Sequence, residues 1–308
     1  MTDHAPLTAA DLAGMLATGA DLPRELATQQ EPDAASALPV VVDERGDRVL
    51  TDVAYARLGG FRPLVLDLRV PPAAGPVPVV LYLHGGAFQW GSHHGPLFGI
   101  AEALADAGIA TASAQYRLEG EAPFPASLHD VHAALRWLRV VGPELGLDPD
   151  RVGVMGESAG GFLAAFAGLR PREPALVGEV GIVGGGVEAR VDAVVGWYAY
   201  TGSVLEQHPD PAVVSWASPM SHVDADAAPM LLLHGDADAL VPMANSSGLV
   251  DALTAVGVEA EFSAVPGAAH VFDGVDPSPV VARTTAYFAA RLDAHRGRHQ
   301  GPRRGPPT

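Results

Sequence analysis

The sequence lacks cysteine and, among its 308 residues, contains no lysine either. The absence of cysteine excludes disulfides, thiolate ligands for a metal and a cysteine nucleophile. The absence of lysine excludes a Schiff-base mechanism and a phosphate-binding P-loop. All 19 basic side chains are therefore arginines.

Positive charge and long apolar runs are also scarce. With 36 acidic and 19 basic residues the net charge is -17, which disfavours nucleic acid and anionic membranes as partners. No run of about 18 uncharged apolar residues is available for a membrane span. The N-terminus lacks the basic and apolar segments of a secretory signal. We therefore expect a cytoplasmic globular protein, monomeric or homodimeric, that acts on a small molecule.

The stretch around Ser158 carries the strongest local pattern. Apolar residues 151–155 predict a buried strand, and the small apolar residues 159–169 predict a helix. Between them Ser158 has Gly156 and Gly160 two positions away on either side, which is the G-x-S-x-G pattern of a nucleophile elbow. A side chain at either glycine would collide with the opposite arm of so sharp a turn. The pattern alone is equally compatible with a glycine-rich connection that contains an incidental serine.

Predicted strands alternate with helices along most of the chain, which favours a mostly parallel sheet covered on both faces. An antiparallel pair, 49–58 and 64–70, precedes the alternating part. In parallel sheets functional residues gather at the carboxyl ends of the strands. Four polar residues directly follow predicted strands, and we expect them to meet in space: His84, Ser158, Asp238 and His270.

A serine hydroxyl needs a base to take its proton, and the base needs a carboxylate to orient it. Ser158, Asp238 and His270 follow one another in the order expected for an elbow nucleophile. Asp236 competes with Asp238, but we expect it to cap backbone amides of its turn. His234 ends the same strand and is expected to hydrogen-bond within the loop.

An oxyanion needs preorganised donors, and glycine-rich backbone supplies them. The segment His84-Gly85-Gly86 follows a strongly apolar predicted strand, 77–83. We expect the amides of Gly85, Gly86 and Ala159 to bind the oxyanion, since Ala159 follows the nucleophile.

Aromatic residues flank the loops near this centre and are candidates for a substrate pocket, although core packing explains any one of them equally well. They are Phe88, Trp90, Trp197, Tyr198, Tyr200 and Trp216. Two histidine pairs, His93-His94 and His129 with His132, lack a matched carboxylate spacing, so we expect neither a metal nor any other cofactor.

Together these motifs resemble the hormone-sensitive-lipase-like carboxylesterases of the α/β-hydrolase fold, overlapping the feruloyl-esterase-like bacterial enzymes. The matching segments lie within about residues 60–290 and are 84–87, 116–118, 124–126, 156–161, 234–238, 241–242 and 267–270. The resemblance implies an eight-stranded, mostly parallel sheet with helices on both faces and a small cap. Ala87 stands where the family often has a third glycine, which argues against bulky tertiary-alcohol esters.

We expect an N-terminal cap segment at 1–47, a catalytic domain at 48–294 with a cap insertion at about 201–228, and a disordered tail at 295–308. The favoured function is a serine carboxylesterase for short-chain or aromatic esters. The same triad would also suit an amide or formamide hydrolase or an exopeptidase. A non-catalytic binding protein of the same fold is disfavoured, because such proteins characteristically lose the serine or the histidine.

Overall fold

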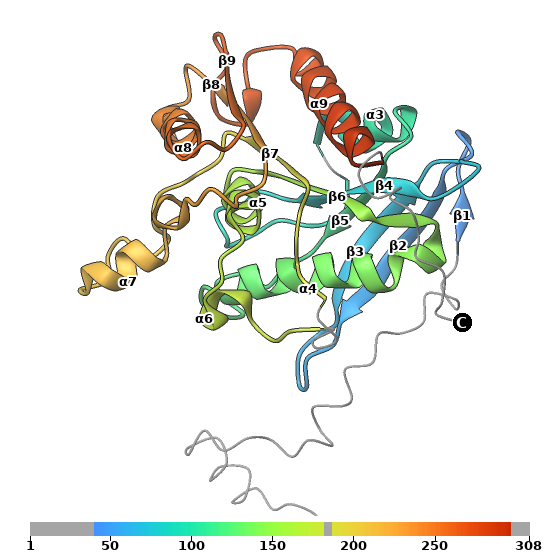
Figure 1. The fold of residues 1–308 in the computed structure, drawn as a ribbon, viewed down its shortest axis with the longest axis horizontal. Helices are drawn as coiled ribbons and strands as arrows, with labels where there is room; N and C mark the ends of the chain where they lie inside the picture. The colour runs from blue at the N-terminus through green and yellow to red at the C-terminus, as the bar shows by residue number, and fades with distance from the viewer. Residues whose placement is uncertain (1–39, 96, 182–186, 297–308) are drawn as a thin grey trace, which may run out of the picture.

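The structure is a computed structural model that describes residues 40–95, 97–181 and 187–296. Its described strands form one sheet in the order β1-β2-β3-β5-β4-β6-β7-β8-β9 (Figure 1). The strands are β1 (Val41–Val42), β2 (Arg48–Ala56), β3 (Leu64–Val70), β4 (Val77–Leu83), β5 (Ala110–Ala114), β6 (Leu147–Glu157), β7 (Ala193–Trp197), β8 (Met230–Gly235) and β9 (Ala260–Val265).

Helices cover both faces of this sheet, as the alternating sequence pattern predicts. They are α3 (Ile100–Asp106), α4 (Ala126–Val140), α5 (Ala159–Leu169), α6 (Pro174–Val177), α7 (Pro211–Trp216), α8 (Ala244–Ala255) and α9 (Ser278–Arg296). Short 3-10 helices occupy Leu97–Gly99, Gly142–Leu145, Pro219–His222 and His270–Phe272.

Strand pairing changes from antiparallel to parallel along the sheet. The pairs β1–β2, β2–β3 and β3–β5 are antiparallel. The pairs β5–β4, β4–β6, β6–β7, β7–β8 and β8–β9 are parallel. The described part of the sheet has nine strands where the resemblance implies eight. The addition is β1, whose two residues pair with Arg48 and Val49, so this part of the segment 1–47 belongs to the sheet edge rather than to a cap. Residues 1–39, including the helix expected there, lie outside the described part.

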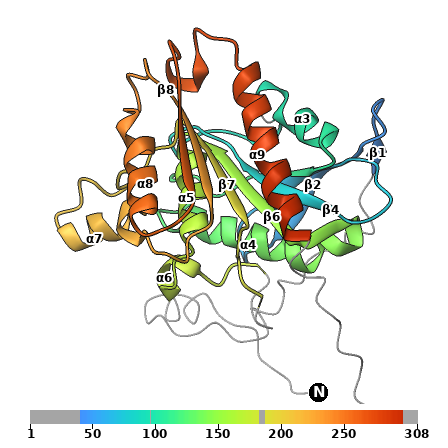
Figure 2. The same cartoon turned by 45° about the horizontal axis from the view of Figure 1, so that its top comes forward.

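The core lies in two layers, one on each face of the sheet. β4 is buried along its whole length, and its alternate side chains enter opposite layers. Leu81 packs among residues of α4, α5 and α8, while its neighbour Tyr82 packs among residues of α3 and α9. Figure 2 shows α3 and α9 together on one side of the sheet and α4, α5 and α8 on the other. A strand buried on both sides explains the continuous apolar run in the sequence.

The ends of the expected domains differ in part from the structure. Helix α9 continues to Arg296, so the first two residues of the expected tail are helical, and 297–308 lie outside the described residues. The expected cap insertion, 201–228, contains α7 and the 3-10 helix at Pro219–His222, and His222 stacks near Phe166 of α5 with ring centroids 5.0 Å apart. Among the described helices, none combines the length and apolarity needed to cross a bilayer.

Two histidines of α4 hold the short helix α6. Nε2 of His129 bonds the carbonyl of Ala175 at 2.7 Å, and Nδ1 of His132 bonds the carbonyl of Val177 at 3.0 Å. His132 is buried, and burial lowers its pKa from 6.5 to about 4. This pair therefore serves packing, and His132 remains neutral near neutral pH.

We predict that His132 makes stability fall in acid. Between about pH 6.5 and pH 4 the unfolded chain binds a proton at this site that the folded chain does not, so the free energy of unfolding decreases as the pH falls. The substitution His132→Gln, which keeps a donor for the carbonyl of Val177, should reduce this decrease by about 2–3 kcal/mol. Urea unfolding of both proteins at a series of pH values measures the difference. The prediction would be contradicted if the free energy of unfolding fell equally with decreasing pH in both proteins.

Candidate active site

Ser158 sits on a sharp turn between β6 and α5, in the backbone conformation φ 51°, ψ -113°. Two close backbone approaches make this turn. A Cβ on Gly156 would lie 2.1 Å from the carbonyl oxygen of Gly160, and a Cβ on Gly160 would lie 2.1 Å from that of Leu83. Any side chain at these positions would force the strand and the helix apart. Ser158 is also the residue before the first turn of α5, where the helix N-terminus favours negative charge.

Three side chains from separate segments converge at this turn. Nε2 of His270 lies 3.2 Å from Oγ of Ser158. On the other side of the ring, Nδ1 of His270 donates to Oδ2 of Asp238 at 2.7 Å. Asp238 lies in the loop after β8, and His270 begins the 3-10 helix after β9. The hydroxyl, imidazole and carboxylate therefore form a continuous hydrogen-bonded chain.

The carboxylate of Asp238 is held by more than the histidine. Its Oδ1 accepts hydrogen bonds from the amides of Leu240 and Val241, each at 2.9 Å. Burial alone would raise the pKa of Asp238, but the hydrogen bonds from His270 and from these amides lower it below its ordinary value. Asp238 is thus an anion near neutral pH. The competing Asp236 instead accepts the amide of Gly267 at 2.7 Å, a backbone-capping contact of the kind expected for it.

His234 is fully buried behind Asp238. Its Nδ1 lies 2.7 Å from Oγ of Ser246, and its Nε2 lies 2.9 Å from the carbonyl of Val241 and 3.2 Å from Oδ2 of Asp238. Burial lowers the pKa of His234, so its ring is neutral and serves as a hydrogen-bonding brace for the Asp238 loop.

The expected oxyanion donors need one correction, which concerns Gly85. Its amide donates to Oε1 of Glu157 at 3.3 Å, so it is already engaged by a carboxylate. The amides of Gly86, Ala87 and Ala159 have no hydrogen-bond partner within the part of the chain that the structure describes. Ala87 therefore takes the place of Gly85 among the candidate donors.

The backbone around Gly86 has a conformation that only glycine adopts readily. Its φ is 118°, and a Cβ there would lie 1.9 Å from the carbonyl oxygen of Trp90. The loop folds back on itself at this point, with the amides of Gln89 and Trp90 both donating to the carbonyl of Gly86. The turn leaves the amides of Gly86 and Ala87 without a partner among the described residues, so they remain available as candidate oxyanion donors.

Glu157 is a buried residue whose contribution the sequence motif does not reveal. Its carboxylate accepts hydrogen bonds from the hydroxyls of Tyr82 and Tyr198 as well as from Gly85. It therefore joins β4, β6, the residue after β7 and the loop after β4 around one anion. The signal available in the sequence is an acidic residue that directly follows the apolar run 152–156 at the end of β6.

Phe88 and Tyr200 are the two expected pocket residues that the structure places in the wall of a cavity beside Ser158. The other four lie elsewhere. Trp197 is fully buried and donates to Oγ1 of Thr284 at 2.9 Å. Tyr198 is buried beside Glu157, with its ring edge-on to His270 at 4.8 Å between centroids. Trp90 is 69% exposed, away from the cavity.

The last of the six, Trp216, stands behind the cavity wall. Its ring packs edge-to-face on Phe124, 5.5 Å between centroids, and its Nε1 donates to Glu173 at 2.8 Å. Phe124 itself faces the cavity. Trp216 therefore supports the wall without forming it.

A mostly parallel sheet, with a serine on a sharp turn after a central strand and an acid and a histidine on later loops, defines the α/β-hydrolase fold. The chain belongs to the BD-FAE family, whose model matches residues 66–209 and 202–253, more than half of the sequence. The fold class and the resemblance to bacterial carboxylesterases seen in the sequence are thereby confirmed.

Known proteins with similar sequences and structures carry esterase names. Probable carboxylic ester hydrolase LipM of Mycobacterium tuberculosis is 29% identical over 83% of this chain and 63% of its own length. Esterase LipC of the same organism is 29% identical over 73% of this chain and 60% of its own. A truncated carbohydrate esterase from gut microbiota superposes with a TM-score of 0.72 and 27% identity, covering 80% of this chain and 96% of the other. The chain thus spans less than two thirds of the two mycobacterial relatives.

We predict that the tyrosine hydrogen bonds to Glu157 stabilise the fold. The substitution Tyr198→Phe leaves Oε2 of Glu157 buried without its donor, and the free energy of unfolding should fall by about 1–3 kcal/mol. Tyr287→Phe is a matched control, because the buried hydroxyl of Tyr287 has no partner among the described residues and its removal should be neutral or stabilising. Urea unfolding measures the free energy of unfolding of both variants. Equal decreases would argue against a stabilising role of the hydrogen bonds to Glu157.

Proposed function

We propose that this protein is a carboxylic ester hydrolase that uses Ser158 as nucleophile, His270 as base and Asp238 as the orienting carboxylate. The observation that carries the proposal is the hydrogen-bonded chain from Oγ of Ser158 through the imidazole to Oδ2 of Asp238, at 3.2 Å and 2.7 Å. The esterase names of the relatives support the same chemistry. The cytoplasmic location and the monomeric or homodimeric state remain predictions from the sequence alone.

In the first half-reaction, Nε2 of His270 takes the hydroxyl proton of Ser158 as Oγ attacks the ester carbonyl carbon. The charge that develops on the carbonyl oxygen is bound by the amides of Gly86, Ala87 and Ala159. The imidazolium, stabilised by Asp238, gives its proton to the alcohol oxygen as the carbon–oxygen bond breaks, which leaves an acyl group on Ser158.

In the second half-reaction, His270 takes a proton from a water molecule, which attacks the acyl carbon. The same amides bind the second oxyanion, and the imidazolium returns its proton to Oγ as the bond to Ser158 breaks. The carboxylic acid leaves and the enzyme is restored. No cofactor takes part in the proposed cycle.

The cavity beside Ser158 favours a small acyl or aromatic group. Its volume of about 660 Å³ lies within the range of small-molecule sites. Phe88, Phe124 and Tyr200 form an aromatic side, and Val204 and Leu205 add aliphatic surface. Ala87 places a methyl group in the cavity wall where the family often has a glycine, which disfavours esters of bulky tertiary alcohols.

We predict that Ser158→Ala abolishes both turnover and labelling. A fluorophosphonate probe should label the wild-type protein at Ser158, and hydrolysis of short aryl esters should fall at least about 10³-fold in the variant. Ser221→Ala, which changes an exposed serine that does not line the cavity, is the control and should keep both activities. Matched anilides should react far more slowly than the esters. An unlabelled wild-type protein would favour a binding protein, and faster anilide cleavage would favour an amidase.

We predict that Gly86→Ala lowers kcat by about 10²–10³-fold, as expected when an oxyanion donor is displaced. The added Cβ collides with the carbonyl of Trp90, and the left-handed backbone disfavours alanine. Gly95→Ala is the matched control, because Gly95 lies in the same loop with φ 73° and nothing within 4 Å of an added Cβ. Steady-state kinetics beside urea unfolding separates displaced donors from general unfolding. An unchanged kcat in a folded Gly86→Ala variant would show that the amides of the loop around Gly86 do not bind the oxyanion.

A further inference from the structure

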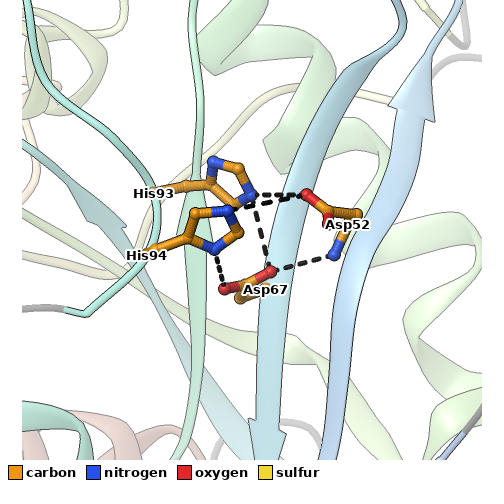
Figure 3. Close-up of side chains that lie close together, drawn as sticks. All are labelled: Asp52, Asp67, His93 and His94. Carbon is orange, nitrogen blue, oxygen red and sulfur yellow. Dashed lines mark hydrogen bonds and ion pairs between the residues drawn. The ribbon is translucent and has the colours of Figure 1, made fainter.

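Four metal-ligating side chains meet at the antiparallel edge of the sheet, outside the site described above. Figure 3 shows Asp52 of β2 and Asp67 of β3 facing His93 and His94 of the loop after β4. One ligand atom from each residue lies within 4.8 Å of the others. None of the four is hydrogen-bonded to Ser158, Asp238 or His270 within the described residues.

The distances between these atoms suit a small tetrahedral site. Nε2 of His93 lies 2.9 Å from Oδ1 of Asp52 and 3.5 Å from Oδ1 of Asp67. Nδ1 of His94 lies 2.8 Å from Oδ2 of Asp67. Because Zn²⁺ binds such ligands at about 2.0–2.2 Å, tetrahedral neighbours are roughly 3.3–3.5 Å apart. The three pairs given lie near that spacing, and because all four atoms lie within 4.8 Å of one another, no pair has to close by more than about 1.5 Å.

The charges and burial of the group also favour a cation. The two imidazole rings are tilted against each other by 41°, with 3.9 Å between centroids, and the carboxylates of Asp52 and Asp67 face them. His93 is 4% exposed, whereas the side chains of Asp52 and His94 are 62% and 57% exposed. The site therefore has one buried ligand, His93, and an exposed side formed by Asp52 and His94 through which an ion can enter.

A backbone hydrogen bond orients one of the two carboxylates toward the histidines. The amide of Asp52 donates to Oδ1 of Asp67 at 2.9 Å, which fixes the second carboxylate from behind. Asp52 lies where the β2–β3 register shifts, with φ 55°, so this amide leaves the ladder and turns to a side chain.

We propose that Asp52, Asp67, His93 and His94 form a binding site for a divalent transition metal, with Zn²⁺ as the best fit. Two imidazole nitrogens and two carboxylate oxygens match the ligands of Zn²⁺, whereas Ca²⁺ and Mg²⁺ take oxygen ligands. Four protein ligands close a tetrahedral site, so the ion is structural. It ties the loop that carries Gly86 and Ala87 to the edge strands β2 and β3.

The test is a calorimetric titration of the untagged full chain with Zn²⁺ after treatment with a chelator. We expect one ion per chain, with affinity at least about 10-fold lower in Asp52→Asn and in His94→Gln and lost in the double variant. Both replaced side chains are largely exposed and both amides keep hydrogen-bonding capacity, so the variants should fold. His129→Gln, which removes an imidazole elsewhere, is the control and should bind Zn²⁺ like the wild type.

A second readout reports the coordination itself. Co²⁺ in place of Zn²⁺ should give the visible absorption of a tetrahedral ion in the wild type and not in the double variant. Zn²⁺ should also raise the midpoint of thermal unfolding of the wild type and of the His129→Gln control, but not that of the double variant. Absence of binding, or equal binding by wild type and double variant, would overturn the proposal and leave a hydrogen-bonded cluster. Ester hydrolysis is not used as a readout, so the result is independent of the proposed catalytic function.

Discussion

The arrangement of the site depends on the contact of bare backbone with bare backbone at the turn around Ser158. Gly156 faces the carbonyl of Gly160, and Gly160 faces that of Leu83, with no room for a side chain at either glycine. These contacts set the distance between β4, β6 and α5. They therefore place the serine, the first amides of α5 and the loop after β4 relative to one another before any other side chain is considered.

The carboxylate of Glu157 fixes the neighbouring elements relative to the same turn. Glu157 is the last residue of β6, and the groups that it binds belong to β4, to the residue after β7 and to the loop after β4. It orients the loop through Gly85 and leaves the following amides for substrate. The proposed triad is braced in a similar way from β8, because His234 and two backbone amides hold Asp238 while Asp238 holds His270.

Local patterns allowed much of this to be predicted from the sequence. The elbow is encoded in five adjacent residues, Asp238 follows β8 with its plain apolar run, and His270 lies in the glycine-containing loop after β9. What escaped prediction depends on partners distant in the chain. Gly85 is occupied by Glu157, 72 residues away, and His93 meets Asp52 across 41 residues of separation. The burial of Trp197 and Tyr198 escaped prediction for another reason. Trp197 ends β7 and Tyr198 follows it, and burial at that point depends on α9 and on the later loops.

The part of the cavity wall formed by residues 206–208 has fewer buried contacts than the rest of the site. Glu206, Gln207 and His208 are exposed and lie outside the sheet and both core layers, whereas Ser158 and the residues around it are fixed by buried contacts. Substitutions in this wall can therefore accumulate at little energetic cost to folding. For the proposed hydrolase, such a division lets a lineage change its substrates over evolutionary time while the chemical step stays the same.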